Sequence, residues 1–177
     1  MRIISISIFA ISKIPARRLS APPARAGEGE RVKNPFMQAA LEEAKTAAAE
    51  GEIPVGAVIV RDGEIIAAGR NACEAEGDPK LHAEMLAISR ACEAVGGWRL
   101  SDCDIYVTLE PCLMCAGALL NARIRRIYFG AYDAKNGACG SVCDVGTMGF
   151  THKPEIYGGI CADECAALLG GFFEKRR

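Results

Sequence analysis

The sequence predicts an α/β fold in three layers, with helices on both faces of a central, mixed, five-stranded sheet. Short apolar runs rich in β-branched residues alternate with longer stretches of helical periodicity, which is the pattern of strands and covering helices. Asp62-Gly63 joins two of these runs as an antiparallel hairpin, whereas a later strand–helix–strand segment predicts a parallel crossover. With 177 residues, half of them hydrophobic, the chain can form one domain with a sizeable core.

Capping and turn residues place the individual elements. Asn34-Pro35 and Asp78-Pro79 are typical of helix starts, because Asn and Asp cap the first turn and Pro lacks an N–H that would have no partner there. The predicted helices cover residues 35–50, 79–95, 111–121 and 162–177. The predicted strands cover residues 53–60, 64–69, 104–109, 125–130 and 155–159, and residues 70–78 and the Gly-rich stretch 131–154 are expected to be loops.

The first 34 residues differ in composition from the rest of the chain. They carry a net charge of +5, whereas residues 35–177 carry −6. We interpret residues 1–34 as an extension, either a disordered tail or the product of a start assigned too early, because Pro22-Pro23 and the following Ala/Gly/Glu run cannot build a packed element. A secretory signal and an organelle transit peptide are the alternatives. Residues 35–177 are expected to form the functional domain.

Composition narrows the class of partner and the compartment. No apolar run approaches the ~20 residues that span a bilayer, so no membrane partner is expected. Bulk charge does not predict a nucleic-acid partner, which would need a local basic patch. Nine cysteines are an odd count in a chain longer than most secreted disulfide scaffolds. We therefore expect core residues or free thiols, and a reducing cytoplasmic location.

Residues 79–121 hold the pattern His-x-Glu, a spacer, and Pro-Cys-x-x-Cys. His82, Cys112 and Cys115 are a ligand set that leaves a tetrahedral zinc ion with an open fourth position. Both sulfurs lie on one face of a predicted helix start, and His82 is expected in the first turn of the other helix. Glu84 lies about 200° around that helix from His82, which favours proton transfer over metal ligation. The sequence therefore predicts a hydrolytic site with one Zn²⁺ per subunit.

Three other interpretations of the cysteines and histidines remain open. A closed structural zinc site would need a fourth ligand, for which His152 is the one other histidine. The Cys-x-x-Cys pair could be redox-active, although this leaves His-x-Glu unexplained. A second metal site is conceivable, built from Cys139, Cys143, Cys161 and Cys165.

The resemblance to a known family is carried by four segments, DPKLHAEM, TLEPCLMCAGAL, RRIYFGAYDAKNGACGS and ICADECAALLGGFF. The first two are shared across the cytidine/deoxycytidylate deaminase superfamily, whose zinc signature is His-x-Glu with Pro-Cys-x-x-Cys. The last two are more particular to the bacterial tRNA-specific adenosine deaminases, which residues 35–177 resemble. The resemblance implies a cytidine-deaminase-like α/β/α fold, a homodimer, and hydrolysis of the wobble adenosine to inosine in the anticodon stem-loop of a tRNA-Arg.

The same resemblance implies roles for individual residues. His82, Cys112 and Cys115 would bind zinc, zinc-bound hydroxide would attack the base, and Glu84 would shuttle protons. The implied substrate contacts are Asn71, Asp133, Lys135 and Val55, with Pro54 beside Val55 in the wall of the base pocket. Further tRNA contacts would come from Arg123, Arg125, Arg126 and the terminal Lys175-Arg176-Arg177. A deaminase of free guanine or cytosine and a zinc-stabilised RNA-binding module remain the competing functions.

Overall fold

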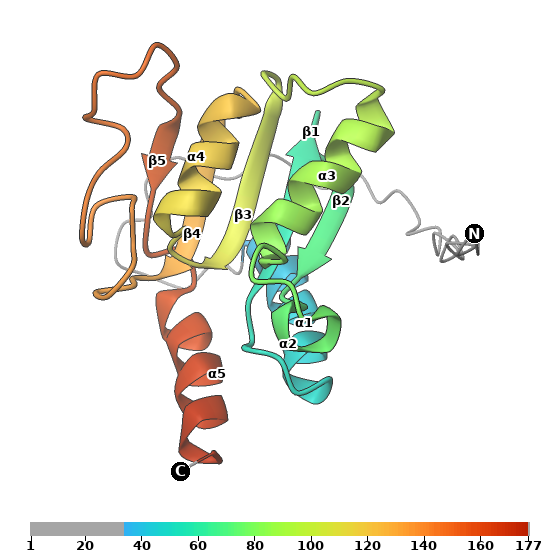
Figure 1. Cartoon of the computed structure of the whole chain (residues 1–177), viewed down its shortest axis with the longest axis vertical. Helices are drawn as coiled ribbons and strands as arrows, with labels where there is room; N and C mark the ends of the chain where they lie inside the picture. Colours follow the sequence, from blue (N-terminus) through green and yellow to red (C-terminus); the bar gives the residue numbers. More distant parts are fainter. Residues whose placement is uncertain (1–33, 177) are drawn as a thin grey trace, which may run out of the picture.

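The computed structural model of the protein describes residues 34–176 (Figure 1). The predicted extension, apart from Asn34, and the terminal Arg177 lie outside the described residues. The strands are β1 (Gly56–Arg61), β2 (Glu64–Arg70), β3 (Cys103–Leu109), β4 (Arg126–Ala131) and β5 (Glu155–Tyr157). The helices are α1 (Pro35–Ala49), α2 (Cys73–Glu76), α3 (Ala83–Val95), α4 (Leu113–Asn121) and α5 (Ala162–Glu174). No helix within residues 34–176 is long and apolar enough to cross a bilayer.

The five strands form one mixed sheet in the order β2-β1-β3-β4-β5. β1 pairs antiparallel with β2 and β3, whereas β3, β4 and β5 run parallel. Asp62 and Gly63 both have positive φ, at 51° and 79°, as a two-residue hairpin turn requires. The mixed sheet, the hairpin and the parallel crossover through α4 confirm the predicted fold class.

Two apolar layers bury the sheet on both faces. α3 and α4 cover one face, and α1 and α5 cover the other (Figure 1). Along β3, Ile105 and Val107 belong to the cluster under α3 and α4, while Tyr106 belongs to the opposite cluster. The ring centroids of Tyr106 and Phe36, in α1, are 5.1 Å apart. Because a slip of one residue would move each side chain into the wrong layer, this alternation determines the register of β3.

The segment before α3 differs from the prediction. α3 begins at Ala83 rather than at Asp78-Pro79, and the expected loop before it contains the single-turn helix α2. The Asp78 carboxylate accepts a hydrogen bond from the backbone N–H of Lys80 at 2.9 Å, which makes a turn instead of a helix cap. The carbonyl of Leu81 then accepts from the N–H of Ala72 at 3.0 Å, and His82 has extended backbone angles (φ −68°, ψ 155°). His82 therefore directly precedes α3, and its expected place in the first turn was wrong.

Other boundaries shift by smaller amounts. β1 begins at Gly56 rather than at residue 53, because a tight turn from the N–H of Val55 to the carbonyl of Ile53 (2.8 Å) interrupts the strand. Pro54 and Val55 consequently lie in the segment that leads into β1, where both are buried. α5 ends at Glu174, two residues before the end of the described chain.

Gly69 lets β2 approach the start of α3 closely. A Cβ at this position would lie 2.3 Å from the carbonyl oxygen of Ala83 and 2.6 Å from the backbone nitrogen of Ala87. We expect Gly69→Ala to lower the free energy of unfolding by roughly 1–3 kcal/mol, because the clash is with backbone that cannot rotate away. Thermal and urea unfolding would measure it. The matched control is Gly117→Ala in α4, where a Cβ meets nothing within 4 Å and should leave stability equal or higher. Equal stability of the two variants would contradict the prediction.

Candidate metal and catalytic site

Two helix starts lie at the same end of the sheet. α3 and α4 pack side by side on one face, and both begin near the lower end of the sheet in Figure 1. His82 and Cys112 occupy the positions just before the two helices, and neither side chain caps its helix. The unpaired N–H groups of both first turns therefore give this end of the sheet a positive potential, which favours anionic ligand atoms.

The donor atoms of His82, Cys112 and Cys115 all lie within 4.8 Å of one another. Nδ1 of His82 is 3.7 Å from Sγ of Cys112 and 3.4 Å from Sγ of Cys115. A tetrahedral zinc ion with ordinary Zn–S and Zn–N bonds holds its ligand atoms about 3.5–3.8 Å apart. The three side chains therefore fit a zinc ion, and within residues 34–176 no other group of His, Cys, Asp and Glu meets this criterion.

The two thiols of the site have pKa values that are shifted in opposite directions. A hydrogen bond from the Cys115 thiol, followed by one from His82, lowers the pKa of Cys112 to about 4. The same contact with Cys112, together with burial, raises the pKa of Cys115. The hydrogen bond to Cys112 raises the pKa of His82. The lowered pKa of Cys112 favours its thiolate, which is the form that binds a cation.

Glu84 lies one residue inside α3, beside the donor atoms. It is buried, with 4% of its surface exposed, and its carboxylate contacts the Cys115 thiol. Desolvation by burial raises the pKa of this carboxyl group to about 7. A carboxyl with such a pKa accepts and returns protons readily near neutral pH.

Two alternatives raised by the sequence, a fourth ligand from His152 and a second metal site, are not supported by the structure. Nε2 of His152 lies 2.7 Å from the carbonyl oxygen of Ile124, beyond the far end of α4, so it is not a fourth ligand. None of the nine cysteines forms a disulfide, and Cys139, Cys143, Cys161 and Cys165 do not form a second metal group.

Backbone hydrogen bonds bring two predicted substrate residues, Val55 just before β1 and Asn71 just after β2, to this same end. The carbonyl of Val55 accepts from the N–H of Asn71 at 3.0 Å. The next residue, Ala72, donates to the carbonyl of Leu81 at 3.0 Å. Val55 and Asn71 are therefore held next to the segment that carries His82, and both are at most 8% exposed.

The loop after β4 is tied to the turn that carries Cys112. Gly137 forms an isolated β-bridge with Cys112, and the N–H of Ala138 donates to the carbonyl of Pro111 at 2.9 Å. Asp133 and Lys135 lie on this loop. The Asp133 carboxylate accepts from the N–H of Lys135 at 2.9 Å, so it also shapes the loop, while the Lys135 side chain is exposed.

Sequence reasoning missed two buried carboxylates that hold these loops. Glu110 is 2% exposed and accepts from the N–H groups of Asp133, Cys139 and Ser141 at 2.9–3.0 Å, and from the Ser141 hydroxyl. Glu52 is 1% exposed and accepts from Asn71. An acidic residue directly before Pro-Cys was a usable signal for Glu110, whereas nothing in the chain marks Glu52 as buried.

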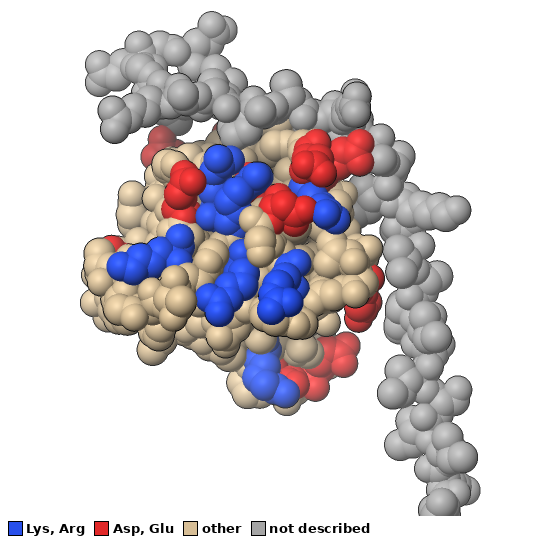
Figure 2. Space-filling view, turned by 90° about the horizontal axis from the view of Figure 1, so that it is seen from above, with Lys and Arg blue, Asp and Glu red and all other residues tan. Residues whose placement is uncertain are grey.

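Several basic residues proposed for tRNA contact lie at the opposite end of the sheet. Arg125 directly precedes β4 and Arg126 is its first residue, and both form ion pairs with Asp104, at 2.9 and 3.6 Å. Figure 2, which views the molecule from the top of Figure 1, shows Lys and Arg gathered on this face. The structure does not bring these arginines to the metal ligands. Arg176 behaves differently, because its guanidinium donates to the carbonyl of Gly51, the residue before Glu52.

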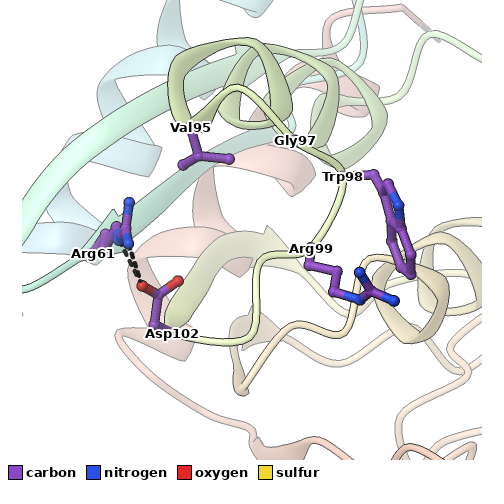
Figure 3. A pocket seen from close by; sticks show the side chains of 6 residues that line it. All are labelled: Arg61, Val95, Gly97, Trp98, Arg99 and Asp102. Carbon is purple, nitrogen blue, oxygen red and sulfur yellow. Dashed lines mark hydrogen bonds and ion pairs between the residues drawn. The ribbon is translucent and has the colours of Figure 1, made fainter.

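A hollow of about 290 Å³ also lies at the end away from the metal ligands. Trp98, Arg99 and the ion pair between Arg61 and Asp102 line it (Figure 3). Asp102 precedes β3, whereas Cys112 follows it, so the hollow and the candidate metal site are separated by the length of that strand. None of the three candidate metal ligands lines this hollow.

The comparisons with known proteins agree with the donor set. The model of the cytidine and deoxycytidylate deaminase zinc-binding region matches residues 30–131. A tRNA-specific adenosine deaminase of Bacillus subtilis is 45% identical over 143 residues, which are 80% of this chain and 89% of that relative. The chain belongs to the family of tRNA-specific adenosine deaminases.

Similarity to solved structures agrees with this family assignment. A structure from work on A-to-I editing by tRNA:A34 deaminases at the wobble position of transfer RNA is 46% identical, with a TM-score of 0.73, and covers 76% of this chain and 98% of that chain. A guanine deaminase of Bacillus subtilis is 33% identical with a TM-score of 0.53, over 66% of this chain and 85% of that chain. The fold is common to both, and the higher identity is with the tRNA:A34 deaminase.

The donor set predicts the metal content of the purified enzyme. We expect about one zinc ion per chain, and less than a tenth of that in Cys112→Ser or Cys115→Ser, because a hydroxyl is a poor zinc ligand. Elemental analysis after dialysis measures it. Cys92→Ser is the matched control, since Cys92 is a half-buried thiol near the other end of α3 and should leave the zinc content unchanged. Full zinc content in the Cys115 variant would rule out the proposed ligand set.

Proposed function

We propose that this deaminase hydrolyses the wobble adenosine of a tRNA anticodon, of the tRNA-Arg type, to inosine and ammonia. The observation that carries the proposal is the combination of a complete His82–Cys112–Cys115 donor set, beside Glu84, with 45% identity to a tRNA-specific adenosine deaminase. A zinc ion bound to these donors would supply a Lewis acid and a water molecule acidic enough to attack carbon 6 of the base near neutral pH.

Glu84 is the proton carrier in this proposal. Its buried carboxylate takes one proton from the attacking water and delivers it to ring nitrogen 1. It then takes the remaining proton from the new hydroxyl on carbon 6 and delivers it to the amino group, which leaves as ammonia. The pKa of about 7 suits a group that must both accept and donate protons in one turnover. The balance is one water consumed and one ammonia released. The N–H groups at the starts of α3 and α4 favour the negative charge that develops during attack.

The substrate contacts are assigned to the segments that surround the donors. Val55, with Pro54, walls the base, Asn71 hydrogen-bonds the nucleoside, and Asp133 and Lys135 contact the anticodon backbone. Support comes from the backbone bonds that hold Val55 and Asn71 beside the His82 segment, and from the bridge between Gly137 and Cys112. A base splayed out of a loop reaches such a pocket at lower cost than a base in a duplex.

The wider biological setting is part of the same proposal. Residues 35–177 form the deaminase domain, which acts as a homodimer and uses tRNA as its partner. A cytoplasmic location suits two thiolate ligands, which must stay reduced to hold the metal. Arg176, beside Gly51, places a cation at the metal end of the sheet, where it suits a phosphate.

A single assay tests the reaction and its main competitor. The purified enzyme is incubated with a tRNA-Arg anticodon stem-loop that carries adenosine at the wobble position, and separately with free guanine and free cytosine. We expect inosine only in the RNA, and only at the wobble position; a stem-loop with the adenosine moved by one position is the control. Ammonia from guanine or cytosine without inosine in the RNA would favour the free-base deaminase, which the similarity to guanine deaminase keeps as the second candidate.

Glu84→Gln separates an enzyme from a zinc-stabilised binding module. Glutamine keeps the size of the buried side chain but cannot carry the proton, so we expect kcat to fall by about 10²–10⁴-fold. Zinc content and affinity for the stem-loop should stay near those of the wild type. Glu42→Gln in α1 is the control, because it removes the charge of an exposed carboxylate away from the site. Unchanged turnover in Glu84→Gln would remove this residue from the mechanism.

A further inference from the structure

Glu52 forms a buried hydrogen-bonded pair with Asn71. Oε2 of Glu52 accepts from Nδ2 of Asn71 at 2.9 Å, and Oε1 accepts from the backbone N–H of Ala75 at 2.8 Å. Glu52 is 1% exposed and Asn71 is 7% exposed. Within residues 34–176, no buried side-chain nitrogen or oxygen lacks a partner, so this pair is part of a satisfied polar network.

The chemistry of the pair determines which way the Asn71 amide points. An ionised carboxylate accepts hydrogen bonds and donates none, so the NH₂ group of Asn71 must face Glu52. Oδ1 then faces the other way, where the thiol of Cys73 lies at 3.6 Å and acts as a weak donor. Both neighbours therefore favour the same amide orientation.

The backbone of Asn71 has its own support, which does not depend on Glu52. Its N–H donates to the carbonyl of Val55 at 3.0 Å, and the neighbouring N–H of Ala72 donates to Leu81 at 3.0 Å. The main chain at this position is consequently held by the sheet edge and by the segment before α3. What Glu52 adds at Asn71 is control of the side chain alone.

We infer that Glu52 is a positioning residue that holds the amide of Asn71 with a single polarity toward the nucleoside. The inference rests on the proposed function, in which Asn71 hydrogen-bonds the target nucleoside. With Nδ2 committed to Glu52, the amide offers the substrate one fixed arrangement of its oxygen and its remaining N–H. If the Asn71 amide were reversed, its donor would face a donor of the nucleoside, or its acceptor an acceptor. The substrate would then bind more weakly, and the base would be oriented less well.

Glu52→Gln should reverse this amide without unfolding the segment. The N–H of Ala75 can only donate, so the glutamine must keep its oxygen there, and its NH₂ group then faces Asn71. Asn71 is expected to turn its amide and accept. Both hydrogen bonds survive, so the melting temperature should stay close to that of the wild type, while kcat/KM for the wobble stem-loop falls by about 10- to 100-fold.

A double-mutant cycle with Asn71→Ala distinguishes positioning from a structural role through Ala75 and α2. If Glu52 acts through Asn71, Glu52→Gln has no further effect on kcat/KM once Asn71 is alanine. The second measurement is the dissociation constant for the stem-loop in the Glu84→Gln background, which reports binding without turnover and should rise in Glu52→Gln. Glu50→Gln is the matched control, because Glu50 is exposed and its partner is Arg70, so kcat/KM should not change.

Several results would overturn the inference. A loss of kcat/KM that persists in the Asn71→Ala background would assign the effect of Glu52 to α2. If the Asn71→Ala enzyme were as active as the wild type, Asn71 would have no role in substrate binding and Glu52 no role in positioning it. Inosine formation by the wild type would still leave the proposed function intact. If the wild type deaminated free guanine instead of the RNA, the proposed function would fail, and the same cycle measured on guanine would decide the role of Glu52.

Discussion

The convergence of two helix starts on one end of the sheet is the constraint on which the rest of this structure depends. The crossover from β3 through α4 to β4 places Cys112 and Cys115 there, and the packing of α3 beside α4 brings His82 to within 3.7 Å of both sulfurs. Two helix dipoles and their unpaired N–H groups then stabilise thiolate where a cation can bind. The same packing buries Glu84 beside the donors, which raises the pKa of its carboxyl group.

Buried carboxylates extend this arrangement from the metal ligands to the segments around them. Glu110 gathers four donors from the loop after β4, and Glu52 joins the segment before β1 to Asn71 and α2. Loops seldom hold a defined conformation without such bonds, because their backbone groups have no ladder of partners. The surroundings of the site are therefore ordered by two acceptors that are not metal ligands, and neither carboxylate has to take part in proton transfer.

Charge is distributed unevenly between the two ends of the sheet. Arg125 and Arg126 at the far end already face Asp104, so their charge is partly neutralised within the protein. The metal end carries Lys135, which is exposed on the loop after β4, and Arg176, which lies beside Gly51. Under the proposed function, we expect recognition of the anticodon to depend more on the shape and hydrogen bonding of the pocket than on a broad basic surface.

The sequence by itself determined the fold class and the donor set, because both are written in local patterns. Apolar periodicity and the Asp62-Gly63 turn identify the mixed sheet, and the spacing of His82, Glu84, Cys112 and Cys115 identifies the site. Only the tertiary structure decided that His82 precedes its helix and that Arg125 lies at the end of the sheet away from the metal ligands. It alone revealed that Glu52 is buried against Asn71. These features depend on contacts between residues distant in the chain, such as Ala72 with Leu81, which no local propensity encodes.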